Sequence, residues 1–309
     1  MTNFSHNFAG AGALRADSID VTGTVTAASL VGTLTGNSTG THTGPVVTDD
    51  LRLRDVSLIA PPPNTSAELL AMTGLTSVAA WRLDQVGVTG NVTSFGNLAG
   101  TLATAGTPTF GHPLASASGG SARGMYFDAA TGDACSAAVL DPASSSFVAG
   151  GRFGFVSDPA GTTHLLFGRV KVGATFLGWG VYVTDAGNIV CFIGDAAGTD
   201  FSFTLASAAL TIGAPPVEVV VQLDRSGAQP ILRGRYSRNG VTLGNNSVTC
   251  TALGTLTSAG QEFGFGAVPA AAPAYNSGTW AQWAWYASGT QAEGATKPQT
   301  IAQGLGWEQ

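Results

Sequence analysis

This sequence is poor in charged residues. Only 10% of its 309 residues are Asp, Glu, Lys or Arg, against about 25% in an average globular domain. The lysines are Lys171 and Lys297 alone, and 13 basic against 19 acidic residues leave a net charge of −6. Nucleic-acid binding needs a dense basic patch that displaces phosphate counterions, so nucleic acid is not an expected partner.

Long apolar runs and paired cysteines are also missing. The best apolar run, Val217–Leu223, contains Glu218 and is far shorter than the roughly 20 residues that span a bilayer. Cys135, Cys191 and Cys250 are odd in number and widely spaced, which suits neither a disulfide framework nor a C-x-x-C zinc site. The N-terminus lacks the basic and apolar segments of a secretory signal. We therefore expect no membrane insertion, three free thiols inside strands, and synthesis and assembly in a cytoplasm.

The usual motifs of metal sites and nucleophilic catalysis are absent from the sequence. His6, His42, His112 and His164 are dispersed, and none stands at i, i+4 spacing or beside a carboxylate cluster. Three copies of His42 on a shared axis are an alternative ion site, less favoured than a packed or solvated histidine. There is no G-x-S-x-G nucleophile motif. The sequence thus predicts no metal and no cofactor.

Paired carboxylates for glycoside hydrolysis are equally hard to find. That chemistry needs two carboxyl groups that face each other across a cleft. The pairs available, such as Asp84 with Asp128 or Asp224 with Glu262, have no motif behind them, and the chain has five glutamates. We therefore expect a protein that is not an enzyme, with a polysaccharide-degrading enzyme as the disfavoured alternative.

Glycine and apolar residues are what the sequence has in abundance. It contains 43 glycines and 44% hydrophobic residues, with a mean hydropathy of +0.22, which excludes bulk disorder. Gly, Thr, Ser and Val favour strands and tight turns, so the fold class is all-β. The chain changes character twice, which divides it into a short head (residues 1–16), a Thr/Gly/Val-rich stretch with a proline-rich end (17–66), and a long strand pattern (67–309).

The second segment alternates in residue type. From Leu30 to Val46, small or apolar residues occupy every even position except that of His42, and Thr and Asn dominate the odd ones. Because side chains alternate across a strand, one face is narrow enough for close approach of other chains. Such a strand cannot bury anything alone, so we expect a self-associating shaft; a flexible linker is the alternative. The expected shaft core is Val25, Leu30, Gly32, Leu34, Gly36, Gly40, Gly44 and Val46.

This segment resembles the shafts of tailed-bacteriophage fibre proteins. The resemblance rests on Val31–Gly40, V-G-T-L-T-G-N-S-T-G, which is similar to the L-x-G-N-x-x-G repeats of those fibres. It implies a homotrimer whose chains intertwine in a short β shaft, with a globular domain beyond it.

The third segment contains A-W-R-L-D at 80–84, R-G-M-Y-F-D at 123–128 and V-V-V-Q-L-D-R at 219–225. In these motifs and their order it resembles the concanavalin-A-like, laminin-G-type jelly roll. The Asn239-Gly240 pair also predicts a two-residue hairpin in its own right. Many short strands between glycine turns independently favour a β-sandwich. The landmarks appear in the family's order at residues 80–84, 100–102, 108–111, 123–128, 178–183, 187–192, 219–225, 235–241, 263–266 and 280–286.

The jelly-roll resemblance also raises two binding questions. Related domains often bind Ca²⁺ through loop carboxylates, but here the family's loop is degraded to Asp128-Ala129-Ala130-Thr131-Gly132-Asp133, so calcium is not expected. An aromatic strand near the C-terminus is either a glycan-facing platform or core, and the family's pattern favours core. Its members are Trp280, Trp283, Trp285 and Tyr286.

Together the two resemblances imply a structural virion fibre. Phe4, His6 and Phe8 share one strand face, and exposed phenylalanines on a polar tip mark a protein contact; we expect them to anchor the fibre to a capsid or tail protein, a frayed terminus being the alternative. The knob would then bind a host-surface receptor or glycan, as a tail fibre on the virion surface. A capsid-attached head fibre or decoration protein is the alternative, and a secreted adhesin is disfavoured.

Overall fold

The computed structural model describes most of the chain after residue 62. Its described residues are 63–84, 90–113, 123–128, 133–137, 142–156, 163–171, 177–184, 186–208, 214–238, 241–256, 262–266 and 279–308, all within the unit Arg54–Gln309. The expected head and shaft, with Phe4, His6, Phe8 and every shaft-core residue, lie outside these residues.

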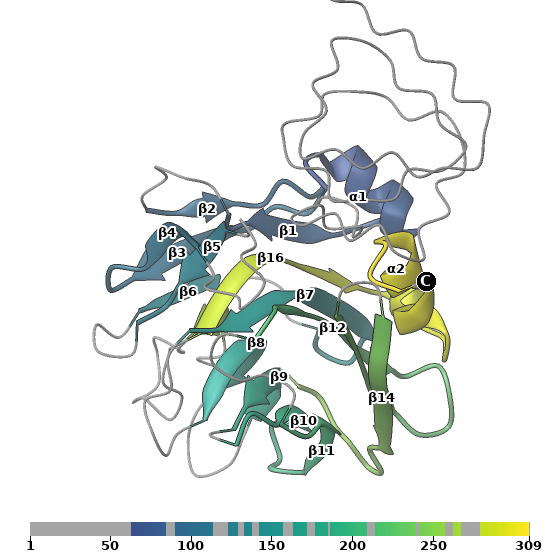
Figure 1. Ribbon diagram of the computed structural model, residues 1–309. Coiled ribbons are helices and arrows are strands. Elements are labelled where there is room, and N and C mark those ends of the chain that lie inside the picture. The colour runs from purple at the N-terminus through teal and green to yellow at the C-terminus, as the bar shows by residue number, and fades with distance from the viewer. Residues whose placement is uncertain are drawn as a thin grey trace, which may run out of the picture. The chain divides into compact units, whose positions relative to one another are not determined.

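The unit is a sandwich of two antiparallel β-sheets (Figure 1). In the first sheet the strand order is β14-β13-β12-β7-β16-β5-β4, and β1 also pairs with β16. Its strands are β1 (Ala79–Arg82), β4 (Thr109–Pro113), β5 (Arg123–Tyr126), β7 (Phe147–Phe155), β12 (Val217–Asp224), β13 (Ile231–Arg238), β14 (Val241–Thr249) and β16 (Thr279–Ser288).

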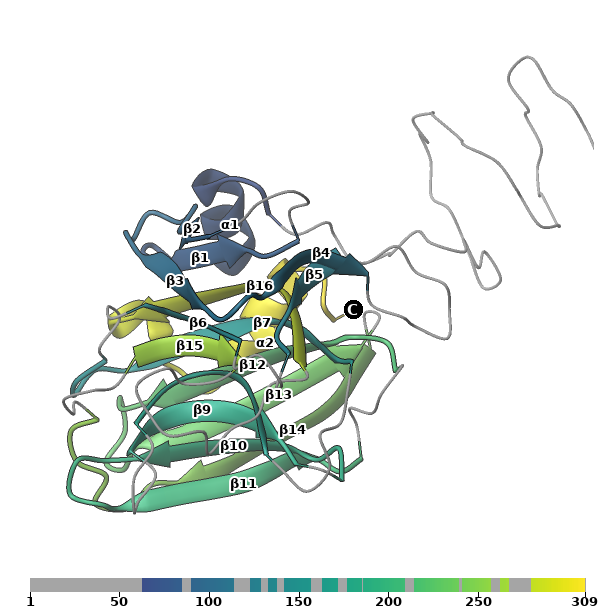
Figure 2. The same cartoon turned by 90° about the vertical axis from the view of Figure 1, so that its left-hand side faces the viewer.

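The second sheet has the order β11-β10-β9-β8-β15-β6-β3-β2. Figure 2 shows it as a layer stacked on the first, with β9, β10 and β11 far from α1. Its strands are β2 (Val92–Thr93), β3 (Thr101–Ala105), β6 (Ala134–Ala137), β8 (His164–Lys171), β9 (Leu177–Val183), β10 (Ile189–Gly194), β11 (Asp200–Ala206) and β15 (Glu262–Gly266).

Strand alternation builds the core between the sheets. In β12 the odd positions, from Val217 to Leu223, are fully buried in the inter-sheet core, while Glu218 and Gln222 point to the other face. Aromatic rings from both sheets meet in this core: Trp179 lies 4.4 Å from Phe147 between ring centroids. The expected β-sandwich is therefore confirmed.

Most of the sequence landmarks fall on strands, and two predicted hairpins form. β9 pairs with β10, and β13 pairs with β14 on either side of Asn239-Gly240. The sulfur atoms of Cys191 and Cys250 are buried and free. Cys191 lies on a strand, but Cys250 comes directly after β14, so its expected place inside a strand was wrong by one residue.

A purely β third segment was also an incorrect expectation, because two helices are present. Helix α1 (Ser66–Thr73) begins with a reciprocal capping box between Thr65 and Glu68 and ends at Gly74 with φ +64°, a backbone conformation that favours glycine. The T-x-x-E spacing is a sequence signal for this helix start. Helix α2 (Lys297–Gly304) follows the 3₁₀ turn η1 (Thr290–Ala292).

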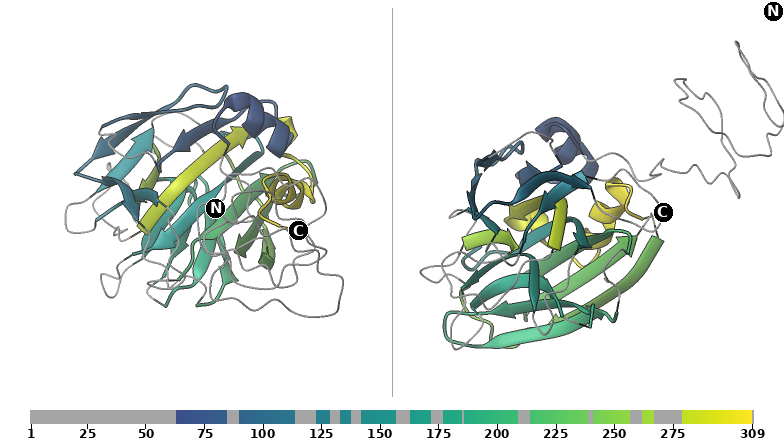
Figure 3. Two further views of the ribbon diagram at one scale, coloured as in Figure 1. Left: turned by 45° about the horizontal axis from the view of Figure 1, so that its top comes forward. Right: turned by 60° about the vertical axis from the view of Figure 1, so that its left-hand side comes forward.

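Both helices cover the outward face of the first sheet at β16 (Figure 3). Leu69 of α1 and Ile301 of α2 join Trp283 and Trp285 in a second apolar cluster. The helices approach closely, because a Cβ added at Gly304 would lie 1.8 Å from the carbonyl oxygen of Met72. No helix in the described part of the chain is long and apolar enough to cross a membrane.

Candidate functional site

The aromatic strand does not form a glycan-facing surface. Trp280, Trp283, Trp285 and Tyr286 are all 2% exposed or less. Trp283 and Trp285 lie under the helices, Tyr286 faces the inter-sheet core, and the Trp280 indole donates to the His112 carbonyl at 3.0 Å. The glycan-stacking alternative is thus corrected: Trp283 and Trp285 are core under the helices, Tyr286 is core between the sheets, and the Trp280 ring is buried as well, as the packing interpretation predicted.

Two of the carboxylates considered for hydrolysis, those of Asp84 and Asp224, are held by structural partners, and the side chain of Glu262 lies outside the described part of the chain. The Asp84 carboxylate accepts from Arg82 Nε at 2.9 Å, and the Asp224 carboxylate pairs with Arg233 at 2.8 Å. Burial acts to raise the pKa of Asp224, but hydrogen bonds from Ser226 and Arg233 outweigh it and hold the pKa below its usual range. Neither carboxylate is left available as an acid or base.

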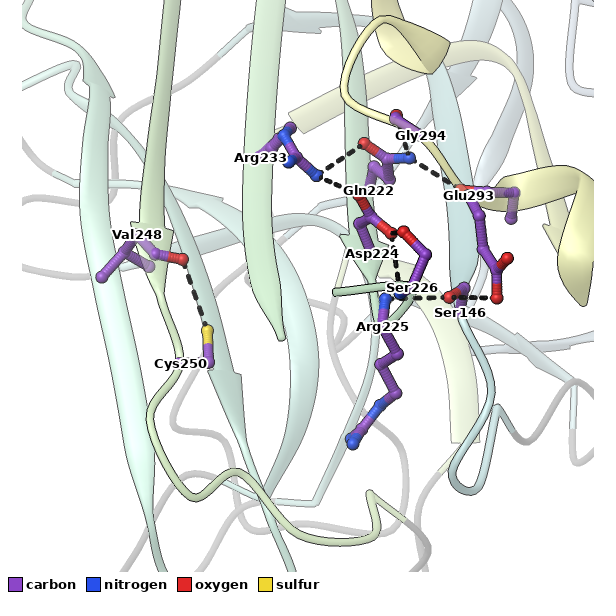
Figure 4. A network of polar contacts seen from close by, with 11 residues as sticks. Ser146, Gln222, Asp224, Arg225, Ser226, Arg233, Val248, Cys250, Glu293 and Gly294 are labelled. Atoms are coloured by element: carbon purple, nitrogen blue, oxygen red, sulfur yellow. Dashed lines mark hydrogen bonds and ion pairs between the residues drawn. The ribbon is translucent and has the colours of Figure 1, made fainter. Parts of the chain in front are cut away.

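The Asp224 network fastens the C-terminal segment to the sheet (Figure 4). Beside Asp224, the Gln222 amide donates to the carbonyls of Ala292 and Gly294 at 2.7 and 2.9 Å. The Ser146 hydroxyl donates to Glu293 at 3.3 Å and accepts from the Arg225 backbone at 3.0 Å. These contacts join β12, β7 and the segment around η1, so the network is structural.

Two further buried aspartates hold loops rather than a metal. Asp133 accepts the backbone N–H groups of Thr107 and Asp128. Asp195 accepts those of Ala197, Thr199 and Gly254. Burial acts to raise the pKa of Asp195, but these hydrogen bonds outweigh burial and lower it. Inward-pointing N–H groups would repel a cation.

No metal-ligand cluster was found in the part of the chain that the structure describes.

A buried ion pair lies on the helix-covered face of the first sheet. The Arg152 guanidinium is 3.2 Å from the Glu218 carboxylate and donates to Gln282 at 3.0 Å. Burial raises the pKa of Glu218 to about 7, although the charge of Arg152 opposes the shift. Burial likewise lowers the pKa of Arg152. Since desolvation dominates for both partners, this pair costs stability at neutral pH.

Asp200 differs from the carboxylates described above. It is exposed at the start of β11, and among the described residues no hydrogen bond or ion pair engages its carboxylate. The hydroxyl of Ser202, two positions along on the same face, is also exposed and unengaged within that part of the chain. Contacts are made by the carboxylates of Glu68, Asp84, Asp133, Asp195, Glu218, Asp224, Glu293 and Glu308, and Asp128 also has a partner.

Asp200 and Ser202 border a recess of about 100 Å³ on β9, β10 and β11. The rings of Tyr182 and Phe192 form its wall, with centroids 5.7 Å apart. Strand register sets this arrangement, because Phe192 is directly opposite Ser202 on β11. The lining is completed by Ile193 and Phe201.

A glycine lets the aromatic wall form. Gly180 of β9 is opposite Phe192. A Cβ at this position would lie 2.8 Å from the Phe192 ring, so the ring occupies space that any larger residue would fill. Burial raises the pKa of the half-exposed Tyr182 phenol, so this group stays protonated at neutral pH. The recess therefore combines aromatic surface with a carboxylate and hydroxyl groups, the mixture that binds a small polar molecule with an apolar side.

Sequence reasoning missed this site. Its signal is the alternation Asp200-Phe201-Ser202-Phe203-Thr204, which indicates a strand with one polar face. The pattern says nothing of the partner strand that supplies the rings.

Comparisons with known proteins identify the fold. No protein-family model matches the chain, and no curated protein matches it in sequence. The structure of the binding domain of Paraclostridial mosquitocidal protein 1 is similar, with a TM-score of 0.51 at 8% identity over 75% of this chain and 52% of that one. The botulinum neurotoxin serotype D binding domain has a TM-score of 0.50 at 10% identity over 76% and 52%. The chain spans about half the length of these structures, and the likeness shows a shared β-sandwich fold.

Proposed function

We propose that the unit described by the structure is a lectin-like adhesion domain of the concanavalin-A-like jelly-roll type. One observation carries this proposal: the exposed recess on β9, β10 and β11 holds a carboxylate, Asp200, that has no partner among the described residues and lies next to aromatic rings. Catalysis has less support, since Asp84 and Asp224 are both held by arginines. The two solved structures named above are binding domains by name.

In the full chain, this domain would be the knob of a homotrimeric bacteriophage fibre. The support is the alternating Gly/Thr pattern of residues 30–46 and the phenylalanines Phe4 and Phe8 near the N-terminus. On this proposal the shaft joins three chains, the N-terminus binds a capsid or tail protein, and the knob faces a host-surface receptor or glycan.

Two measurements on the full chain test the fibre proposal. Light scattering should give about three times the chain mass, and Gly36→Val or Gly40→Val should reduce it, because a side chain would separate backbones that meet. A monomer at micromolar concentration would refute the shaft. Labelling intact particles against this protein should show it at a tail tip; label over the capsid would instead favour a head fibre.

Adhesion is tested separately. The labelled full chain should bind intact host cells saturably and lose binding after the cell-surface polysaccharide is oxidised with periodate. The release of reducing ends from that polysaccharide would show an enzyme instead.

A further inference from the structure

The recess on β9, β10 and β11 has the chemistry of a saccharide subsite of a particular class. We propose that it binds one neutral sugar residue, whose hydroxyl groups donate to Asp200 and whose apolar face lies against Tyr182. This inference rests on the adhesion function proposed above and specifies its ligand.

Charge selects a neutral ligand. Among the described residues that line the recess, Asp200 is the one with a carboxylate, and none is Lys, Arg or His. A sialic or uronic acid would place a second carboxylate beside Asp200 without a cation between them, which is unfavourable at close range. A neutral hydroxyl group, by contrast, donates a charge-assisted hydrogen bond to the carboxylate.

The arrangement of the polar groups suits neighbouring hydroxyls. Asp200 and Ser202 are alternate residues on one face of β11 and lie directly opposite Gly194 and Phe192 of β10. Gly194 has no side chain to cover the carboxylate, which leaves Asp200 open to solvent. The carboxylate has two acceptor oxygens, and the serine hydroxyl both donates and accepts. Adjacent sugar hydroxyls can therefore reach both side chains.

Size limits the ligand to one residue. A volume of about 100 Å³ is well below the roughly 300 to 1,000 Å³ of pockets that enclose a whole drug-sized ligand. That space accepts one edge of a pyranose ring, with the rest of the ring against the half-exposed Tyr182. A helix or strand of a partner protein would not enter it.

Ligand titration of the full chain tests the proposal. The probes are the methyl glycosides of glucose, galactose and mannose, and the methyl glycoside of N-acetylneuraminic acid, followed by saturation-transfer NMR. We expect at least one neutral hexoside to bind saturably in the millimolar range and the sialoside to bind at least ten-fold more weakly. Asp200→Asn should weaken the hexoside at least ten-fold and Ser202→Ala about three-fold, whereas Ser247→Ala, a matched exposed serine on β14, should change nothing.

Several results would overturn the neutral-sugar site. They are tighter binding of the sialoside, no saturable binding by any neutral hexoside, an unchanged affinity in Asp200→Asn, or binding of a lysine-containing peptide alone. Cell adhesion separates this failure from that of the proposed function: if the wild type and Asp200→Asn adhere equally, the recess is not the site but adhesion stands. If the wild type does not adhere at all, the adhesion function itself fails.

Discussion

The outward faces of the two sheets differ in what happens to their polar side chains. On the first sheet, β7, β12 and β13 carry charged groups that are paired with each other or with the C-terminal segment, such as Arg235 with Glu308. On the second sheet, β11 presents Asp200 and Ser202 to solvent without a partner in the described residues. The comparison teaches that polar residues on strands are structural where a helix covers them and available for binding where nothing does.

The largest expected effect comes from the covered face. Trp283 is 2% exposed, with its ring 5.4 Å from that of Trp307. Trp283→Ala should lower the free energy of unfolding by about 3 to 5 kcal/mol, because it leaves a large cavity under the helices. Chemical denaturation measures the loss, and Leu243→Ala, at a position 47% exposed, is the control with little effect. An unchanged stability would place Trp283 outside the core.

The buried ion pair predicts a pH dependence. The pKa of Glu218 is raised to about 7 in the folded state from 4.5, so the folded protein binds the proton more tightly. The stability that this tighter proton binding at Glu218 contributes is complete below about pH 4.5 and is lost as pH rises through about 7. The free energy of unfolding should fall by about 3 kcal/mol in total over this range. Arg152 and Arg238 are the charged groups that oppose this shift.

Thermal unfolding at pH 5 and pH 8 measures the pH dependence. The wild type should lose more stability between the two values than Glu218→Gln, whose amide does not titrate. The variant also leaves Arg152 unpaired, and this cost falls equally at both pH values. Identical slopes for the two proteins would contradict the assignment to Glu218.

A smaller loss is expected where the two helices meet. At Gly304→Ala the new Cβ would clash with the Met72 carbonyl, which lies 1.8 Å away, so α2 must shift, at a cost of about 1 to 3 kcal/mol. Gly227→Ala is the matched control, since its Cβ would meet nothing nearer than 3.7 Å. Urea denaturation compares the two variants. Equal midpoints would show that α2 moves away from the Met72 carbonyl without loss of stability.

The smallest effect is expected on the open face. Asp200→Asn and Ser202→Ala remove no contact made within the described residues, so each should change the free energy of unfolding by less than about 0.5 kcal/mol. Calorimetry at neutral pH checks this. A loss above 1 kcal/mol would show that these side chains support the fold, and the contrast between the two faces would disappear.

The sequence by itself determined the local structure of this protein. The run of β-branched valines in Val217–Leu223 favours a strand, and Asn239-Gly240 predicted a hairpin because glycine and asparagine tolerate positive φ. The Thr65 and Glu68 spacing specifies a helix start in the same local way. Each signal works within a few residues, which is why one sequence suffices to read it.

Only the tertiary structure decided which polar residues are engaged. Arg152 reaches Gln282, 130 positions away, and Arg235 reaches Glu308 at a separation of 73. Alternation gives each strand two faces, but it does not say which face a helix covers or which strand lies alongside. The sequence alone therefore does not distinguish Asp200 from Asp224. Their carboxylates differ in contacts because β13 places an arginine beside Asp224, whereas β10 places Gly194 opposite Asp200.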